Sequence, residues 1–410
     1  MTIASDPHHE PSGSGSGPPR TAIVMSGGGA RGAYQVGVLR GLLDLGVFGS
    51  DGSGLDILVG SSAGAINAAR LAASADRLDE AVAGLMEVWS QIRAEQVFRT
   101  DLRSLGGIGA RWVRDLSFGG VLRNVQAKAL LDTSPLRETL LEHVPFEAID
   151  ASIERGALYA LAVPATNLYT ADGVVFVDAA PDVPLWRRGR WSVERRRIRV
   201  DHVLASSAIP IFFPSVEIEG RHFGDGSIRN TAPLSSAINL GADRIVAIGV
   251  RQAGRPTEVA ARHARRTAPS IAQIAGVLLD AVMLDAMEVD IEHSGRVNTS
   301  VLACPSGRRR DPFRWVDVLW LSPSTGFADL AAEHAKGVPR IVRYLMRGLG
   351  SEESTTELVS YLLFDAAFCS RLIEQGRADV ESRREEVLRF FSVGPDRDEG
   401  RGTPTNPSAA

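Results

Sequence analysis

Short runs of apolar residues recur through the first 250 positions of the chain and are typical of buried strands. They lie at residues 21–25, 57–59, 157–163, 174–177, 211–218 and 245–250. Between them, apolar residues recur at helical spacing, as in Val36, Leu39 and Leu43. Strands that alternate with helices indicate an α/β fold, and 410 residues leave room for one large α/β domain with appendages or for two domains.

Helical patterns occupy much of the remaining sequence. Helices are expected at residues 65–71, from 71 to about 99, and at residues 133–143, 269–291 and 326–348. A further strand is expected at residues 299–304, and residues 352–391 are predicted to be helical after a glycine-rich break. Glycines also interrupt an apolar segment at residues 100–124, a pattern found in lids and binding walls as well as in plain loops.

Composition divides the chain into four parts. Residues 1–19 and 394–410 are rich in Gly, Ser, Pro or charged residues and are predicted to be disordered tails. Residues 20–350 are predicted to form the main domain, and residues 351–393 a C-terminal helical segment. This division places every glycine-bounded loop described below in the main domain.

The segment Gly60-Ser61-Ser62-Ala63-Gly64 lies between a predicted strand and a predicted helix. A G-x-S-x-G pattern in this position is typical of a nucleophile elbow, where a sharp turn exposes a serine hydroxyl. The two glycines lack the Cβ atoms that would collide at so tight a turn. The pattern also arises by chance in a chain with 41 glycines, so its place between strand and helix carries the prediction that Ser62 is a nucleophile.

A second glycine-rich loop, Gly27-Gly28-Gly29-Ala30-Arg31-Gly32, follows the first predicted strand and leads into a helix. Such a loop presents unpaired backbone N–H groups and the positive end of the helix dipole, so it attracts an anion. Next to a serine nucleophile, that anion would be the oxyanion of a tetrahedral acyl-transfer intermediate. The loop is therefore a candidate oxyanion hole.

The same loop also satisfies the dinucleotide fingerprint G-x-G-x-x-G through Gly27, Gly29 and Gly32. That fingerprint requires an acidic residue at the end of the next strand to hold the ribose. Asp56 instead stands at the start of that strand. The loop is not a phosphate-binding loop of the Gly-Lys-Ser/Thr type either, and nucleotide binding remains only an alternative.

A serine hydroxyl needs a partner that removes its proton. The downstream histidines do not lie on glycine-bounded turns after a strand; they are His143, His202, His222, His263, His293 and His334. Asp225 does lie on such a turn, because Gly224 and Gly226 flank it after an apolar run. Flanking glycines let a carboxylate approach another loop closely, although Asp-Gly is also a common surface turn.

Taken together, these loops resemble those of the patatin-like phospholipases. The family is marked by G-G-G-x-R/K-G, by G-x-S-x-G and by D-G-G or D-G-A, which correspond here to Gly27–Gly32, Gly60–Gly64 and Asp225-Gly226-Ser227. Residues 205–214 also resemble the block that precedes the aspartate in the family. Ser227 stands where the family has Gly or Ala. The resemblance covers residues 21–250 and extends more weakly to residue 348.

The resemblance implies a three-layer α/β/α sandwich of patatin type over residues 20–350, followed by the C-terminal helical segment. It implies a serine lipid acyl hydrolase in which Ser62 attacks an ester carbonyl and Asp225 takes its proton. Backbone N–H groups of the Gly27–Gly29 region would hold the oxyanion. The implied substrate is a lipid or phospholipid, with no metal or other cofactor. Because an aspartate is a weak base in water, the scheme requires a partly desolvated site.

Bulk composition adds little to this picture. A net charge of −4 gives no indication of a nucleic-acid partner, and two cysteines cannot form a disulfide framework, which favours a cytoplasmic protein. No run approaches the roughly 20 apolar residues of a membrane span. The arginine- and tryptophan-rich segment Trp186–Arg199 is either a peripheral contact for an anionic membrane or an ordinary solvated loop.

Three alternatives to the serine–aspartate hydrolase stay open. A histidine-dependent esterase would use His263, His293 or His334 as the base. A non-catalytic, regulatory relative would show no serine-dependent turnover, and residues after Glu352 would then be a partner-binding module. A nucleotide-binding protein would be stabilised by a dinucleotide. The sequence leaves the lipid class, the need for an activator and the oligomeric state undetermined.

Overall fold

The computed structural model describes most of the chain. The described residues are 19–99, 129–183, 186–230, 232–252, 286–304, 313–334 and 359–392. The two predicted tails (apart from Pro19) and the glycine-interrupted segment 100–124 lie outside these ranges. So do parts of the helices predicted at 269–291 and 326–348 and the first residues of the predicted segment 351–393.

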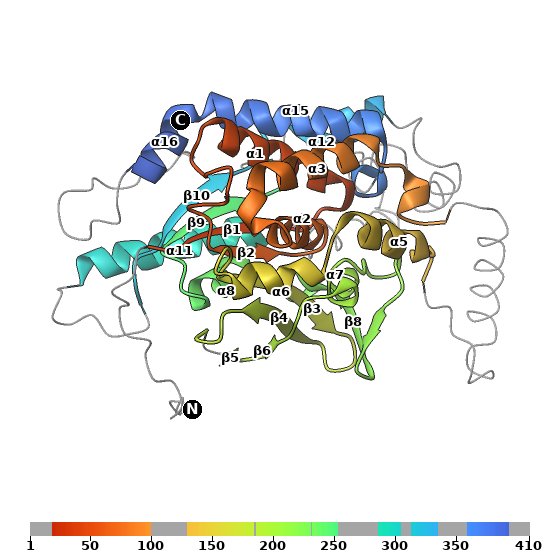
Figure 1. Cartoon of the computed structure of the whole chain (residues 1–410), viewed down its shortest axis with the longest axis horizontal. Helices are drawn as coiled ribbons and strands as arrows, with labels where there is room; N and C mark the ends of the chain where they lie inside the picture. The colour runs from red at the N-terminus through yellow and green to blue at the C-terminus, as the bar shows by residue number, and fades with distance from the viewer. Residues whose placement is uncertain are drawn as a thin grey trace, which may run out of the picture.

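Ten strands of the described residues form one sheet in the order β10-β9-β1-β2-β3-β4-β6-β5, with β8 paired to β3 and β7 paired to β8 (Figure 1). They are β1 (Thr21–Met25), β2 (Ile57–Gly60), β3 (Ala160–Asn167), β4 (Asp172–Ala179), β5 (Arg187–Arg188), β6 (Trp191–Arg195), β7 (Val216–Ile218), β8 (Arg221–Asp225), β9 (Arg244–Ile248) and β10 (Asp317–Leu321). The five strands from β10 to β3 run parallel. Helices cover both faces of these strands, so each reads as a continuous apolar run.

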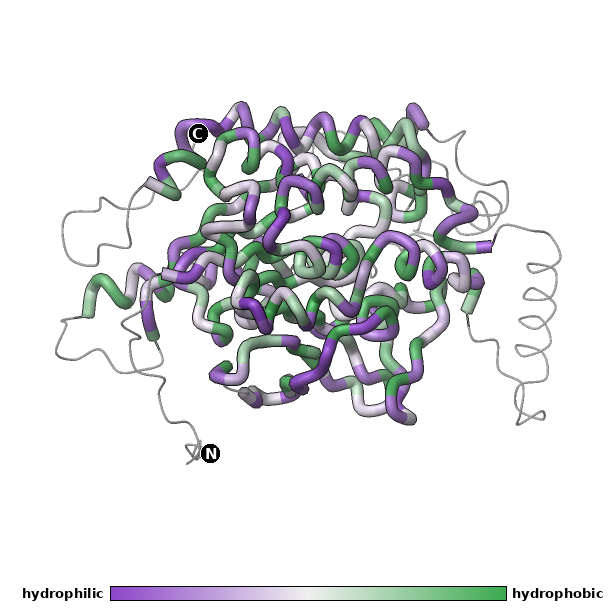
Figure 2. The backbone as a smooth tube through the Cα atoms, viewed as in Figure 1, coloured by the Kyte–Doolittle hydropathy of each residue, from purple (hydrophilic) through white to green (hydrophobic). Residues whose placement is uncertain are grey.

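Helices lie on both sides of the sheet. They are α1 (Gly32–Asp44), α2 (Ala63–Ala72), α3 (Leu78–Gln91), α5 (Ser134–His143), α6 (Glu147–Glu154), α7 (Val200–Ser206), α8 (Pro233–Asn239), α11 (Ala286–Ala303), α12 (Phe327–Glu333), α15 (Ala366–Ser382) and α16 (Arg384–Ser392). Alternate β1 residues point to opposite layers: Ile23 packs with α1, α2, α3 and α15, whereas Val24 packs with α8 and α11. In Figure 2 the central strands are coloured as hydrophobic. The expected α/β/α fold with C-terminal helices is therefore confirmed.

Strand β3 positions two loop ends beside each other. Its first residues pair in parallel with β2, from Ile57↔Ala160 to Val59↔Ala162. Its last residues pair in antiparallel with β8, from Ala165↔Asp225 to Asn167↔Phe223. Because β2 and β8 approach from opposite directions along the same edge of β3, their carboxyl ends meet near the middle of that strand. One of these ends leads into Ser62, and the other is Asp225.

The prediction of a strand at residues 299–304 is wrong, because these residues continue α11 to Ala303. A short apolar run does not by itself distinguish a strand from a buried helical turn. The Asn298 side chain joins this helix to the chain before β10 by donating to the Val316 carbonyl and accepting from its N–H. Strand β10 itself was not predicted from the sequence.

Candidate active site

Ser62 occupies a strained turn between β2 and α2. Its backbone has φ 52° and ψ −123°, a conformation that is uncommon for a residue with a side chain. The turn stays compact because a Cβ on Gly60 would lie 2.1 Å from the carbonyl oxygen of Gly64. Ser62 is 2% exposed, and its carbonyl accepts the first hydrogen bond of α2, from Ala65 N–H at 2.8 Å. This geometry is that of a nucleophile elbow.

The glycine-rich loop packs directly against this elbow. A Cβ on Gly27 would lie 3.1 Å from the Cβ of Ser62, and one on Gly64 would lie 2.5 Å from the Met25 carbonyl oxygen. Only backbones without side chains can approach so closely. The N–H groups of Gly27 and Gly28 donate to no other residue in the described part of the chain. They are available to an anion beside Ser62.

Asp225 lies at the end of β8 and is fully buried. Its Oδ1 accepts a hydrogen bond from the Ser227 N–H at 2.8 Å. Its main chain is fixed by the Ala208 carbonyl, which accepts from the Asp225 N–H at 3.0 Å, and by the Thr166 hydroxyl, which donates to the Asp225 carbonyl at 2.9 Å. Within the described residues, Oδ2 has no hydrogen-bond partner. One carboxylate oxygen is thus held in place and the other is free to accept a proton.

Burial raises the pKa of Asp225 to about 6. The Ser227 N–H and the hydroxyls of Ser62 and Ser227 lower this pKa in part, because each favours the ionised carboxylate. Ser62 and the residues of the aspartate turn meet at Gly27, because the Ser62 Cβ and the Ser227 Oγ lie 3.1 and 2.6 Å from the position that a Cβ on Gly27 would take. No hydrogen bond of ordinary length joins the Ser62 hydroxyl to Asp225 Oδ2. Catalytic hydrogen bonds of this kind are often long without substrate and shorten when substrate binds.

Ser227 places a second hydroxyl in the same corner. Its Oγ lies 2.6 Å from the position that a Cβ on Gly27 would take. Ser227 is 8% exposed, and its Oγ has no hydrogen-bond partner among the described residues. The hydroxyl therefore lies beside Gly27, two residues after Asp225, at a position where the resembling motif has Gly or Ala.

The sequence did not single out Ser206 and Thr166. Ser206 ends α7, and its Oγ accepts a hydrogen bond from the Ser62 N–H at 3.1 Å. It belongs to the block at 205–214 that resembles the family, so a signal for it was present. Thr166 holds the Asp225 carbonyl from within β3, and nothing local in the sequence distinguishes it from other strand residues.

A sequence model of the patatin-like phospholipases matches residues 23–238, more than half of the chain and all the loops described above. The chain belongs to the patatin-like phospholipase family. This membership supports lipid hydrolase activity. A search of curated proteins returns no match.

Solved structures of similar fold have low identity to this patatin-like chain. VipD from Legionella pneumophila is 14% identical with a TM-score of 0.34, and the match covers 92% of this chain and 68% of VipD. Human GIVD cytosolic phospholipase A2, solved with methyl gamma-linolenyl fluorophosphonate, is 15% identical with a TM-score of 0.44. The chain spans 59% of that human enzyme, and 91% of this chain is covered. The family assignment therefore rests on the sequence model.

The other predicted site residues lie in the turns on either side of Ser62 and at the start of α1. Ala30 and Arg31 form the short helical turn before α1, which begins at Gly32. Arg31 is 1% exposed and donates to the Ser360 hydroxyl of the C-terminal segment. Ser61 and Ala63 flank Ser62, and the Asn230 amide donates to the Ser61 hydroxyl at 3.2 Å.

The structure brings no described histidine into this patatin-like site. His202 accepts from the Arg199 N–H through Nδ1, and His222 bonds to the Ser215 hydroxyl. Neither they nor the other described histidines form a hydrogen bond with Ser62 or Asp225, while His263 lies outside the described residues. The nucleotide interpretation requires an acidic residue near the glycine-rich loop. The Asp56 carboxylate instead accepts a hydrogen bond from the Thr21 N–H at the start of β1, and the glycine-rich loop follows the other end of that strand.

The described residues were also compared with the requirements of a metal site and of a membrane-spanning helix. Within the described ranges, His, Cys, Asp and Glu side chains form no group of three that is suited to holding a metal ion. The described helices include none that is both long enough and apolar enough to cross a bilayer.

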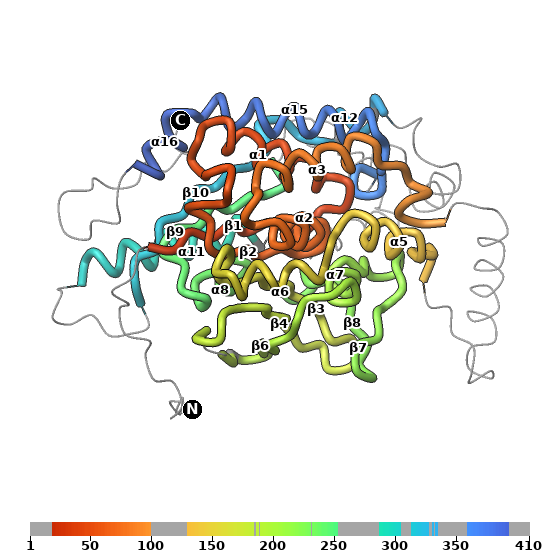
Figure 3. The backbone as a smooth tube through the Cα atoms, in the orientation of Figure 1, coloured from red at the N-terminus to blue at the C-terminus, as the bar shows by residue number. Residues whose placement is uncertain are grey.

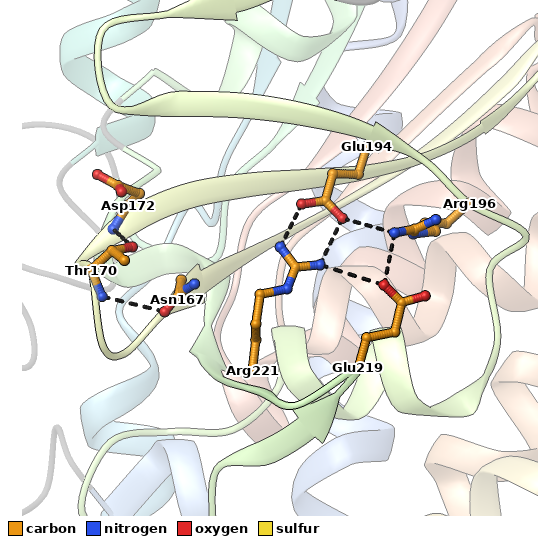
Figure 4. Close-up of polar contacts among 7 residues, drawn as sticks. All are labelled: Asn167, Thr170, Asp172, Glu194, Arg196, Glu219 and Arg221. Carbon is orange, nitrogen blue, oxygen red and sulfur yellow. Dashed lines mark hydrogen bonds and ion pairs between the residues drawn. The ribbon is translucent and has the colours of Figure 1, made fainter.

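Several arginines of the Trp186–Arg199 segment pair with local acceptors, and Figure 4 shows the group around Arg196 and Glu194. Arg196 contacts Glu194 at 3.4 Å and Glu219 at 2.8 Å. Glu194 also accepts two hydrogen bonds, at 2.6 and 2.8 Å, from Arg221 of β8. Arg199 pairs with Asp150 at 2.8 Å. These pairs reduce the positive potential that the segment presents to an anionic surface.

Proposed function

We propose that this chain is a serine lipid acyl hydrolase that works with a Ser62–Asp225 dyad. One observation supports the proposal: Ser62 follows the end of β2, which meets the end of β8 on one edge of β3, and there the buried Asp225 carboxylate has one oxygen without a hydrogen-bond partner among the described residues. In the first step, the Ser62 hydroxyl attacks the ester carbonyl carbon and its proton passes to Asp225. Asp225 then protonates the departing alcohol, and water later releases the fatty acid by the reverse proton path.

The environment of Asp225 makes this base more effective than an aspartate in water. Burial raises its pKa to about 6, so the carboxylate is a stronger base but remains largely ionised at neutral pH. The fixed Oδ1 leaves Oδ2 as the oxygen that accepts the proton. A role for this residue as general base therefore agrees with its hydrogen bonds and with its burial.

The glycine-rich loop supplies the other half of the proposed chemistry. Gly27 lies beside Ser62 and the first residue of α1, Gly32, lies beside Ala63, so the glycine-rich loop borders the place where negative charge would develop on the carbonyl oxygen. Preorganised donors of this kind stabilise a tetrahedral intermediate without rearranging during the reaction. Gly29 continues the same loop, so we assign the oxyanion hole to Gly27–Gly29.

We propose carboxylic esters of phospholipids or lysophospholipids as substrates, with residues 20–350 as the hydrolase domain. Such substrates reside in bilayers, so the enzyme must contact a membrane surface at least transiently. The Trp186–Arg199 segment remains our proposed peripheral contact, with Arg197, which is well exposed, among the residues that face solvent. Comparing turnover of diacyl and lysophospholipid vesicles assigns the subtype.

Labelling by a fluorophosphonate probe tests the proposal. Wild type is expected to react with the probe and to release fatty acid from phospholipid vesicles, and Ser62→Ala is expected to lose both activities. Ser152→Ala is a matched control, because Ser152 is a fully buried serine on α6, next to the amino end of β3. A folded wild-type protein with neither labelling nor turnover would indicate the non-catalytic alternative.

The pH dependence of turnover gives a second test. Because Asp225 must be ionised, kcat/KM is expected to rise about tenfold per pH unit below pH 6 and to level off above it. Asp290→Asn is the control, because burial raises the pKa of Asp290 to about 6 as well, although its partner is the Leu234 N–H. The control should keep the acid limb of the profile. A flat profile between pH 5 and 8 in wild type would argue against Asp225 as the base.

A further inference from the structure

The C-terminal helices return to the first helix of the chain. Figure 3 shows α15, in blue, lying along α1, in red. The two backbones are in close contact. A Cβ on Gly37 of α1 would lie 2.0 Å from the Ile373 carbonyl oxygen. A Cβ on Gly376 of α15 would lie 2.3 Å from the Tyr34 carbonyl oxygen. Since α1 follows the glycine-rich loop directly, the position of α15 bears on the position of that loop.

The segment just before α15 contacts the glycine-rich loop itself. Gly29 has φ +56°, and a Cβ there would lie 2.2 Å from the Tyr361 carbonyl oxygen. At the start of α15, the Cys369 thiol lies 3.9 Å from the Ala30 carbonyl oxygen. Residues 359–369 therefore cover the side of the loop that continues into α1.

Arg31 binds this segment with its charged group. Its Nε and Nη2 donate to the Ser360 hydroxyl at 2.8 and 2.6 Å, and its guanidinium lies 4.1 Å above the Tyr361 ring. Arg31 is 1% exposed and Ser360 is fully buried. A buried guanidinium requires such partners, because its charge is otherwise costly to remove from water. The side chain of the loop is thus fixed by residues more than 300 positions away.

A second set of contacts anchors α15 to α1. The Tyr34 hydroxyl donates to Asp379 Oδ2 at 3.0 Å. Asp379 also accepts from the Ser324 N–H at 3.0 Å and from its hydroxyl at 2.5 Å, which joins α15 to the chain after β10. The phenol, the carboxylate and Ser324 hold the helix in one register along α1.

We infer that Ser360 and Tyr361 are positioning residues for the oxyanion hole, acting through Arg31, and that residues 359–382 form part of the catalytic unit. The inference rests on the proposed function. By fixing the Arg31 side chain and covering Gly29, the C-terminal segment keeps the N–H groups of Gly27 and Gly28 directed at the oxyanion position. Donors of this kind lose effect when they move by fractions of an ångström.

Ser360→Ala and Tyr361→Leu test this inference, with Arg377→Ala as the matched control. Arg377 lies on the same helix and pairs with Asp44 of α1 at 2.7 Å, but it is exposed and far along the helix from the loop. Each test variant is expected to lower kcat by about 10- to 100-fold with KM within about twofold of wild type. Both are expected to increase deuterium exchange of the amides of residues 26–32. Arg377→Ala should change neither quantity.

The two readouts separate the inference from the proposed function. Faster exchange in the loop together with lower kcat supports the positioning role. Unchanged exchange, or faster exchange with wild-type kcat, overturns it, and the proposed function then stands if Ser62→Ala is inactive. If wild type itself shows no serine-dependent turnover, the proposed function fails, and the oxyanion role of the segment fails with it. Tyr361→Leu retains an apolar side chain and provides the test if Ser360→Ala does not fold.

Discussion

Asp225→Asn is expected to lower kcat for ester hydrolysis by about 1,000-fold, because it removes the group that, in the proposed dyad, accepts the Ser62 proton. The amide oxygen can still accept the hydrogen bond that the Ser227 N–H donates to Oδ1, so the turn is expected to keep its shape. The measurement is steady-state turnover of phospholipid vesicles, together with the rate of fluorophosphonate labelling. Wild-type turnover in this variant would show that the dyad is wrong.

The same substitution is expected to stabilise the fold at pH 8. Burial raises the pKa of Asp225 from near 3.8 to about 6, so the folded protein binds this proton more tightly than the unfolded chain does. The stabilising effect of the bound proton is complete below pH 3.8 and is lost as the pH rises through 6. At pH 8 the ionised group costs on the order of 3 kcal/mol, a cost that an amide avoids.

Thermal unfolding at pH 4.5 and pH 8 measures this effect. The difference in Tm between Asp225→Asn and wild type should be larger at pH 8. Asp290→Asn is the matched control: it should show a similar gain, because burial also raises the pKa of Asp290 to about 6, but it should retain turnover. An inactive Asp225→Asn variant with a strongly lowered Tm at both pH values would mean that the activity loss reflects unfolding.

Gly37→Ala is expected to destabilise the protein by about 3 kcal/mol, although alanine normally favours a helix interior over glycine. Gly37 lies in the middle of α1, and its new Cβ would be 2.0 Å from the Ile373 carbonyl oxygen and 2.9 Å from the Ile373 Cα. These are backbone atoms, so relief requires α15 to move away from α1 as a whole. The free energy of unfolding, from urea denaturation, measures the loss.

Gly295→Ala supplies the control for this prediction. Gly295 lies within α11, and a Cβ there would have no atom within 4 Å. This variant should gain about 0.5–1 kcal/mol, as expected for an unhindered helix position. The same change of residue should therefore have opposite signs in the two helices. Equal effects would show that α1 and α15 are not in close contact at Gly37.

Local sequence was sufficient to predict the two turns that carry Ser62 and the glycine-rich loop. Ser62 and the Gly27–Gly32 loop are each defined by their own neighbours, because a strand, a sharp turn and a helix follow one another within a few positions. The roles of Ser62 and Asp225 remain predictions until turnover is measured. Their proximity depends on β3, whose two halves pair with different strands, and no local pattern specifies such pairing.

The features that the sequence did not predict depend on contacts between segments that are far apart in the chain. Arg31 was predicted from its place in the glycine-rich loop, but its partner Ser360 lies 329 positions away in a segment expected to be separate. The run at 299–304 was predicted as a strand, whereas its packing as part of α11 is fixed by Asn298 and Val316. In both cases tertiary packing determines the outcome, and short apolar patterns do not record it.

The contact between α1 and α15 also has a consequence for the order in which the protein is made. The glycine-rich loop leaves the ribosome early in synthesis, whereas Ser360 and Tyr361 follow more than 300 residues later. A nascent chain therefore carries the serine elbow and its loop long before the residues that cover Gly29 exist. Because such long-range contacts form late in folding, lipid hydrolase activity is expected to arise only after Ser360 and Tyr361 have been synthesised and have packed against the loop.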